Sequence, residues 1–73
     1  MKPNVDLARL RQLRGNMPRN DWARLLGYTT HYVRKVENGL LPVSSIMVLS
    51  IARALSRRWE DVASWLQWKS NRK

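Results

Sequence analysis

The stretch Trp22-Ala-Arg-Leu-Leu-Gly-Tyr-Thr-Thr-His-Tyr-Val-Arg-Lys-Val-Glu-Asn-Gly39 decides the expected fold of this chain. It has the pattern of two short helices joined by a turn centred on Gly27, a residue that readily takes the positive φ of such a turn. Thr29 can cap the second helix, which we expect over residues 30–37. The contacts at which the two helices cross would come from small and apolar residues, namely Ala23, Leu26, Val33 and Val36. The stretch therefore predicts a helix-turn-helix.

Helical spacing of apolar residues predicts three further helices around this pair. The first is expected over residues 5–14 with Asn4 as its cap, and Gly15-Asn16 should break it. Pro18 suits the first turn of the helix that ends at Gly27. A fourth helix, capped by Ser44 or Ser45, is apolar nearly all round and is expected to be central to the core. The fifth helix is expected over residues 59–68. The predicted fold class is all-α, as one compact five-helix domain over residues 1–68 with a basic, frayed tail over residues 69–73.

The charge balance indicates a polyanionic partner. The chain has 73 residues, with 14 Lys and Arg against five Asp and Glu, and its formal net charge is +9. Most of the cations are arginines, whose planar guanidinium suits phosphates and guanine edges. Apolar residues are threaded between these cations along the chain, which is typical of a folded basic domain and not of a disordered basic arm.

Composition also excludes several classes of site. The chain has no Cys and one His, so disulfides and thiolate metal sites are excluded and no metal or cofactor is expected. Five carboxylates and one imidazole offer no convergent catalytic set, so we do not expect an enzyme. The start Met1-Lys2-Pro3 leads into no long apolar segment, and a cytoplasmic setting without membrane contact is the default expectation.

Residues 7–56 resemble the Cro/repressor-like helix-turn-helix domains, often called XRE-type. The matching residues are Leu10-Arg11, Met17, Trp22-Ala23, Leu26-Gly27, Thr29, Val33, Val36, Glu37-Asn38-Gly39, Pro42, Leu49, Ala52 and Leu55. The ending Val-Glu-Asn-Gly is the most specific part of this pattern. The chain departs from the family at Pro18-Arg19, where a Ser, Thr or Asn cap followed by Gln is usual. It also has Trp22 in place of the usual Leu, and one additional residue near Asn16.

The resemblance implies a lambda-repressor-like arrangement of five helices in which the third reads DNA. It places a structural ion pair between Arg11 and Glu37. It implies Thr30, His31 and Lys35 as base-reading positions, with Arg34 and Tyr32 beside them. The candidate base contacts are therefore Thr30, His31, Arg34 and Lys35, and the candidate phosphate contacts are Arg19, Thr29, Tyr32 and Asn38. The alternative interpretation is that this outward face is merely solvated, as polar helix faces usually are.

The tryptophans of the last helix raise a separate question. Trp59, Val62 and Leu66 share one helical face that can complete the core, which leaves Trp65 and Trp68 pointing away from it. Exposed aromatic pairs are typical of partner surfaces, so we expect a homodimer interface here. Packing against the first helix, or binding of a different protein, are the alternatives. Arg57 and Arg58 could contact phosphate or only solvate the turn before this helix.

These expectations combine into a function. The sequence favours a small, sequence-specific regulator of transcription that binds double-stranded DNA as a homodimer and represses or autoregulates by occupying its operator. The alternative is an antitoxin-type interaction protein, whose last helix binds a protein partner and which autoregulates its operon. A nonspecific single-strand or RNA binder is disfavoured, because few aromatic residues accompany the basic face.

Overall fold

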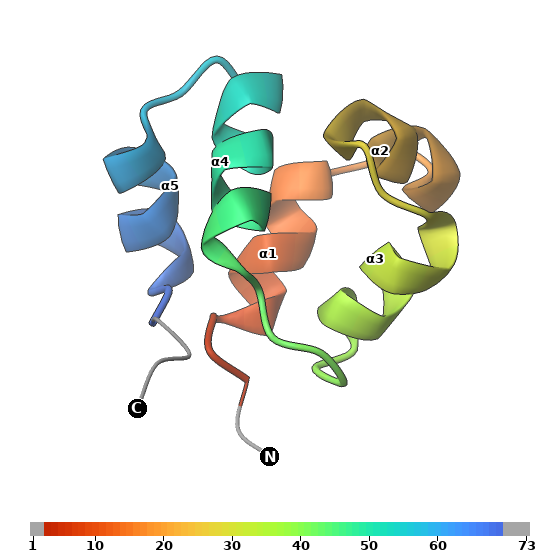
Figure 1. Cartoon of the computed structure of the whole chain (residues 1–73), viewed down its shortest axis with the longest axis horizontal. Coiled ribbons are helices and arrows are strands. Elements are labelled where there is room, and N and C mark those ends of the chain that lie inside the picture. Colours follow the sequence, from red (N-terminus) through yellow and green to blue (C-terminus); the bar gives the residue numbers. More distant parts are fainter. Residues whose placement is uncertain (1–2, 70–73) are drawn as a thin grey trace.

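A computed structural model describes residues 3–69, and within this range the protein is all-helical and has no strand. Its helices are α1 (Leu7–Arg14), α2 (Arg19–Leu26), α3 (Thr30–Glu37), α4 (Ser45–Ala54) and α5 (Trp59–Leu66). Figure 1 shows α1 and α4 in the middle of the molecule, with the α2–α3 pair on one side and α5 on the other. Accordingly, α1 packs against α3 and α5, while α4 packs against α2 and α5. The predicted all-α class is confirmed.

The local signals around α3 and α4 act as the sequence predicted. Gly27 ends α2 in the left-handed region, at φ 83°. The hydroxyl oxygen of Thr29 accepts a hydrogen bond from the main-chain N–H of Tyr32 at 3.1 Å. Ser44 caps α4 in the same way, by accepting from the N–H of Met47 at 3.1 Å. Each hydroxyl satisfies a donor that the first helical turn would otherwise leave unpaired.

The expected role of Asn4 as the cap of the first helix is wrong. That helix begins at Leu7, and the carboxylate of Asp6 caps it by accepting from the N–H of Arg9. Asn4 instead joins three segments that are distant in sequence. Its Oδ1 accepts from the N–H of Val43 at 2.9 Å, and its Nδ2 donates to the carbonyls of Val43 at 2.9 Å and Lys69 at 3.0 Å.

The two ends of the domain are therefore held together. The N–H of Lys69 donates to the carbonyl of Asn4 at 2.9 Å, and the N–H of Asp6 donates to the carbonyl of Leu66 at 2.8 Å. Of the expected tail over residues 69–73, only Lys69 belongs to the described residues.

The core forms where the five helices meet. Its buried apolar residues are Val5, Leu10, Trp22, Ala23, Leu26, Val33, Val36, Val43, Met47, Val48, Ile51, Ala52, Val62 and Leu66. Helix α4 is less central than its composition suggested, since Ile46 is 67% exposed and Leu49 is also exposed. Helix α4 packs against α2 and α5. This packing leaves Ile46 and Leu49 open to solvent.

The expected outward position of Trp68 is also wrong. Helix α5 ends at Leu66, two residues earlier than predicted, and Gln67 takes a left-handed conformation with φ 54°. This reversal turns Trp68 back onto the domain, where its Nε1 donates to the carbonyl of Val43 at 2.8 Å. The Trp68 ring also meets Trp59 edge-on, with ring centroids 5.9 Å apart. Trp65 alone of the predicted pair remains exposed.

No helix within residues 3–69 combines the length and the apolar character needed to cross a membrane.

Candidate nucleic-acid interface

Helix α3 has one buried face and one face open to solvent. Val33 and Val36 are fully buried against the rest of the domain. The residues predicted to contact bases lie on the other side: Thr30, His31 and Arg34 are exposed, and Lys35 is partly exposed. The only carboxylate of this helix belongs to Glu37, which is 1% exposed. The solvent face of α3 is therefore neutral or basic throughout, which suits a polyanion.

Glu37 lies at the centre of an arginine cluster that joins α1, α2 and α3. Arg14 donates to its carboxylate from Nε at 3.0 Å and from Nη2 at 3.3 Å. Arg19 donates from Nε to Oε1 of the same carboxylate at 3.1 Å, the oxygen that also accepts from Nη2 of Arg14. Arg11 reaches the main-chain carbonyl of Glu37 with Nη1 at 2.8 Å. We call Arg11, Arg14, Arg19 and Glu37 the Glu37 cluster.

The prediction that Arg11 forms an ion pair with Glu37 is wrong. The charged partners of Glu37 are Arg14 and Arg19, and Arg11 bonds only to its main chain. Arg11 and Arg14 are three residues apart and therefore lie on the same face of α1, so spacing alone does not distinguish them. Both arginines also lie in the last turn of α1, so only the packing of α1 against α3 decides that Arg14 reaches the carboxylate.

The Glu37 cluster leaves unused donors on Arg19. Its Nε is held by Glu37, and among residues 3–69 its two Nη groups make no hydrogen bond. One buried carboxylate faces two guanidinium groups, so the cluster keeps a net positive charge. A guanidinium that is held at one edge and open at the other can bind a phosphate with little loss of side-chain freedom. This geometry is compatible with the phosphate contact predicted for Arg19.

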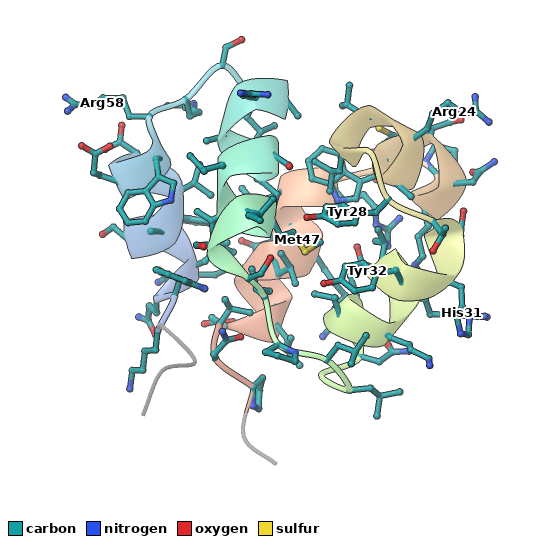
Figure 2. The ribbon with its side chains drawn as sticks, viewed as in Figure 1. Arg24, Tyr28, His31, Tyr32, Met47 and Arg58 are labelled. Carbon is teal, nitrogen blue, oxygen red and sulfur yellow. The ribbon has the colours of Figure 1, made fainter. Side chains whose placement is uncertain are left out.

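Arg34 and His31 are paired on the exposed face of α3. Nη2 of Arg34 lies 3.3 Å from Nδ1 of His31. Because a guanidinium has no acceptor, Arg34 is the donor in this contact. Figure 2 shows His31 and Arg24 pointing outward from α3 and α2 on the same side of the molecule, away from α5. Arg24 is exposed and joins this basic side, although it was not among the predicted contacts.

Apart from Arg19, which begins α2, the residues predicted to contact phosphate belong to α3 or to its two caps. Thr29 uses its oxygen to cap the helix but keeps its hydroxyl hydrogen for another acceptor. Asn38 is exposed at the C-terminal end of α3. Tyr32 is partly buried and its ring stacks on Tyr28, with centroids 4.9 Å apart. Burial raises the pKa of Tyr32 above its ordinary value of 10.0, so its hydroxyl stays protonated and can donate.

Tyr28 is a residue that the sequence analysis did not select. It precedes α3 and so lies outside the helical pattern, but its spacing of four from Tyr32 was a usable signal for a pair. Figure 2 shows both rings in the region between the α2–α3 pair and α4. The stack restrains the ring of Tyr32.

Nothing in the described part of the chain suggests a metal centre, since no three His, Asp or Glu side chains there are grouped to hold an ion.

Comparison with protein-family models, with curated proteins and with solved structures found no match to this chain.

Proposed function

We propose that this protein is a small, sequence-specific regulator of transcription, in which α2 and α3 form a helix-turn-helix and α3 enters the major groove of double-stranded DNA. The observation that carries the proposal is the outer face of α3. It presents Thr30, His31, Arg34 and Lys35 to solvent with no exposed acid among them. In a chain with a net charge of +9, such a face is attracted to phosphate and has side chains that can read base edges.

The way α3 is held supports the same proposal. The two valines of its inner face are fully buried, and the Glu37 cluster ties its last residue to α1 and α2. A helix whose position is fixed on both sides can place side chains at base edges with the accuracy that specificity requires. The resemblance to repressor-like domains, which implies the third helix as the reader, supports the same proposal.

The side chains divide into two kinds of contact. Arg34 and Lys35 are proposed to contact guanine edges, and Thr30 a thymine methyl group or a phosphate. Arg19, Thr29, Tyr32 and Asn38 are proposed to contact phosphates and so to set the register of the domain on the duplex. Regulation would act by occupancy: the bound protein excludes polymerase from the promoter, which makes repression or autoregulation the expected outcome.

Selection of bound duplexes from a random pool tests the proposal, because it reports both the preferred sequence and the spacing of half-sites. Affinities of variants for the selected duplex and for a scrambled one then separate the contacts. Lys35→Ala should lose about 1–3 kcal/mol on the selected duplex and relax the preference at one base pair. Arg19→Ala should weaken both duplexes by similar factors, because a phosphate contact carries no sequence information.

Arg58→Ala is the matched control, since it removes the same charge from the opposite side of the molecule, as Figure 2 shows. It should change affinity less than either variant. Enrichment of no sequence from the pool, or equal losses on both duplexes for Lys35→Ala, would contradict the proposed function.

A further inference from the structure

A cavity lies on the side of the molecule away from α3, between α1, α5 and the connection from α4 to α5. Its volume is about 550 Å³, which is within the range of sites that hold small molecules. Its apolar wall is formed by Leu13, Leu55, Val62 and Trp65. Figure 1 shows α5 and α3 on opposite sides of the α1–α4 centre, so a molecule in this cavity leaves the proposed DNA interface uncovered.

The apolar wall is only partly covered within the domain. Val62 is buried, but Leu13 and Leu55 are partly exposed. Trp65 is 42% exposed, and the guanidinium of Arg9 lies 4.7 Å from the centroid of its ring. Nη1 of Arg9 also donates to the carbonyl of Trp65 at 3.0 Å. These two contacts restrain Trp65, so an apolar ligand that covers it removes little conformational freedom.

The cavity also presents one positive and one negative side chain. Arg57 lies in the connection before α5, and Asp61 belongs to the first turn of α5. Neither makes an ion pair with any residue in the described range 3–69. A simple anion would be repelled by Asp61, and a simple cation would be repelled by Arg57. A ligand that carries both charges can pair with both groups, so the cavity suits a zwitterion with an apolar body.

The turn of α1 that lines the cavity also holds α3 in place. Gln12 and Leu13 line the cavity. Their neighbours Arg11 and Arg14 bond to Glu37, the last residue of α3. Successive side chains of a helix point in directions about 100° apart, so one turn can face two sites at once. A ligand that contacts α1 in the cavity therefore acts on the helix that fixes the end of α3.

We propose that this cavity binds a small zwitterion with a large apolar side chain, of the class of apolar α-amino acids, and that the bound ligand strengthens the binding of α3 to DNA. Arg57 pairs with the carboxylate of the ligand, Asp61 pairs with its ammonium group, and the wall that includes Trp65 covers its side chain. A ligand stabilises the conformation to which it binds more tightly. The cavity is formed with α1 in the position that holds Glu37, so the ligand favours the arrangement in which α3 is fixed.

Binding to the cavity is measured without DNA, so this test does not rest on the proposed function. The probe is L-phenylalanine, which carries both charges and an apolar ring. It is titrated at millimolar concentrations while NMR follows the methyl signals of Leu13, Leu55 and Val62, which should shift saturably. N-acetyl-L-phenylalanine lacks the ammonium charge, and L-phenylalaninamide lacks the carboxylate. Each should bind more weakly by roughly three- to tenfold, because each leaves one charge of the cavity unpaired.

Two variants assign the two charges. Arg57→Gln should weaken the binding of L-phenylalanine by a similar factor but should not weaken that of L-phenylalaninamide, which has no carboxylate to lose. Asp61→Asn should weaken L-phenylalanine but not the N-acetyl compound. Arg58→Gln and Glu60→Gln are the matched controls, since these neighbours pair with each other at 3.2 Å and do not line the cavity. Both controls should bind the probe as the wild-type chain does, and circular dichroism checks that each variant is folded.

The effect on DNA rests on the proposed function and is measured with the duplex selected from the random pool. Saturating L-phenylalanine should raise the affinity for that duplex by roughly fivefold. The duplex should raise the affinity for L-phenylalanine by the same factor, because coupling between two binding sites is reciprocal. At a fixed probe concentration, Arg57→Gln should reduce this response and Arg58→Gln should not.

The site and its effect on DNA fail separately in these experiments. The site is overturned if L-phenylalanine gives no saturable shift, if the acetylated and amidated compounds bind as well as it does, or if the control variants weaken it as much as Arg57→Gln and Asp61→Asn. Saturable binding with an unchanged affinity for the selected duplex would overturn the regulatory effect alone. Enrichment of no duplex sequence would overturn the proposed function, and with it the effect on DNA, while the zwitterion site would stand.

Discussion

Replacing Glu37 with alanine should destabilise the protein far more than loss of an ordinary surface charge. The side chain is 2% exposed, and it accepts three hydrogen bonds from Arg14 and Arg19 at 3.0–3.3 Å. Its removal leaves two neighbouring guanidinium groups without their shared anion. Breaking a buried pair by removing one partner typically costs about 3–5 kcal/mol, because the remaining charge stays desolvated.

The expected loss is somewhat smaller here, because the arginines are only partly buried. The side chains of Arg14 and Arg19 are 19% and 33% exposed, so both can recover some hydration when the carboxylate is gone. We therefore expect Glu37→Ala to lower the free energy of unfolding by about 2–4 kcal/mol. For a domain of this size such a loss lowers the melting temperature by roughly 8–30 °C.

Urea denaturation and thermal melting at a single protein concentration measure this effect. Glu37→Gln should fall between wild type and Glu37→Ala, because the amide keeps the shape and one acceptor oxygen but not the charge. Glu60→Ala is the control, since Glu60 forms an exposed ion pair with Arg58 at 3.2 Å and its loss should leave the melting temperature within error of wild type. If Glu37→Ala and Glu60→Ala have the same melting temperature, the Glu37 cluster does not stabilise the fold and the reasoning is refuted.

Two further predictions concern the ends of the chain and the tyrosine stack. Asn4→Ala should lower the free energy of unfolding by about 1–3 kcal/mol, because it removes the side-chain bonds that join the N-terminal segment to Val43 and Lys69. Exposed Asn20 is the matched control, and an equal effect of Asn20→Ala on urea unfolding would contradict that role. Burial raises the pKa of Tyr32 above 10.0, so its hydroxyl ionises at lower pH in the unfolded chain than in the folded protein. The stability that this difference contributes should be fully present below pH 10 and should be lost as the pH rises through the folded pKa. Absorbance titration of a Tyr28→Phe variant measures this pKa, and a value at or below 10.0 in the folded protein would refute the assignment.

The helices and their caps could be predicted from the sequence because the signals for them are local. Thr29 and Ser44 cap the helices that follow them, and Gly27 takes the left-handed turn that its position between two helical patterns required. The same local periodicity placed Val33 inside and His31 outside on α3. A short amphipathic helix has one apolar face, so its orientation follows from the pattern once the helix exists.

The pairing of charges could not be predicted in the same way. Arg11 and Arg14 share a face of α1, and the choice between them depends on the angle at which α1 passes α3. The side chain of Glu37 meets Arg14 and Arg19, and only its main chain meets Arg11. Arginine side chains are long, so a small change in the angle between the two helices decides which arginine reaches the carboxylate.

Two other features were decided by tertiary packing. Helix α4 is apolar nearly all round, so its pattern could not indicate that Ile46 would face solvent while Met47 would be buried. At the end of α5, the helical spacing that predicted Trp68 outside holds only while the helix continues. The left-handed turn at Gln67 ends it, and the hydrogen bond from Trp68 to Val43 draws the ring inward. Local sequence determined where each helix forms and which face is apolar, because those preferences act within a few residues. Contacts between distant segments decided which arginines meet Glu37, which side of α4 stays open and which tryptophan remains outside, because these depend on how the helices pack.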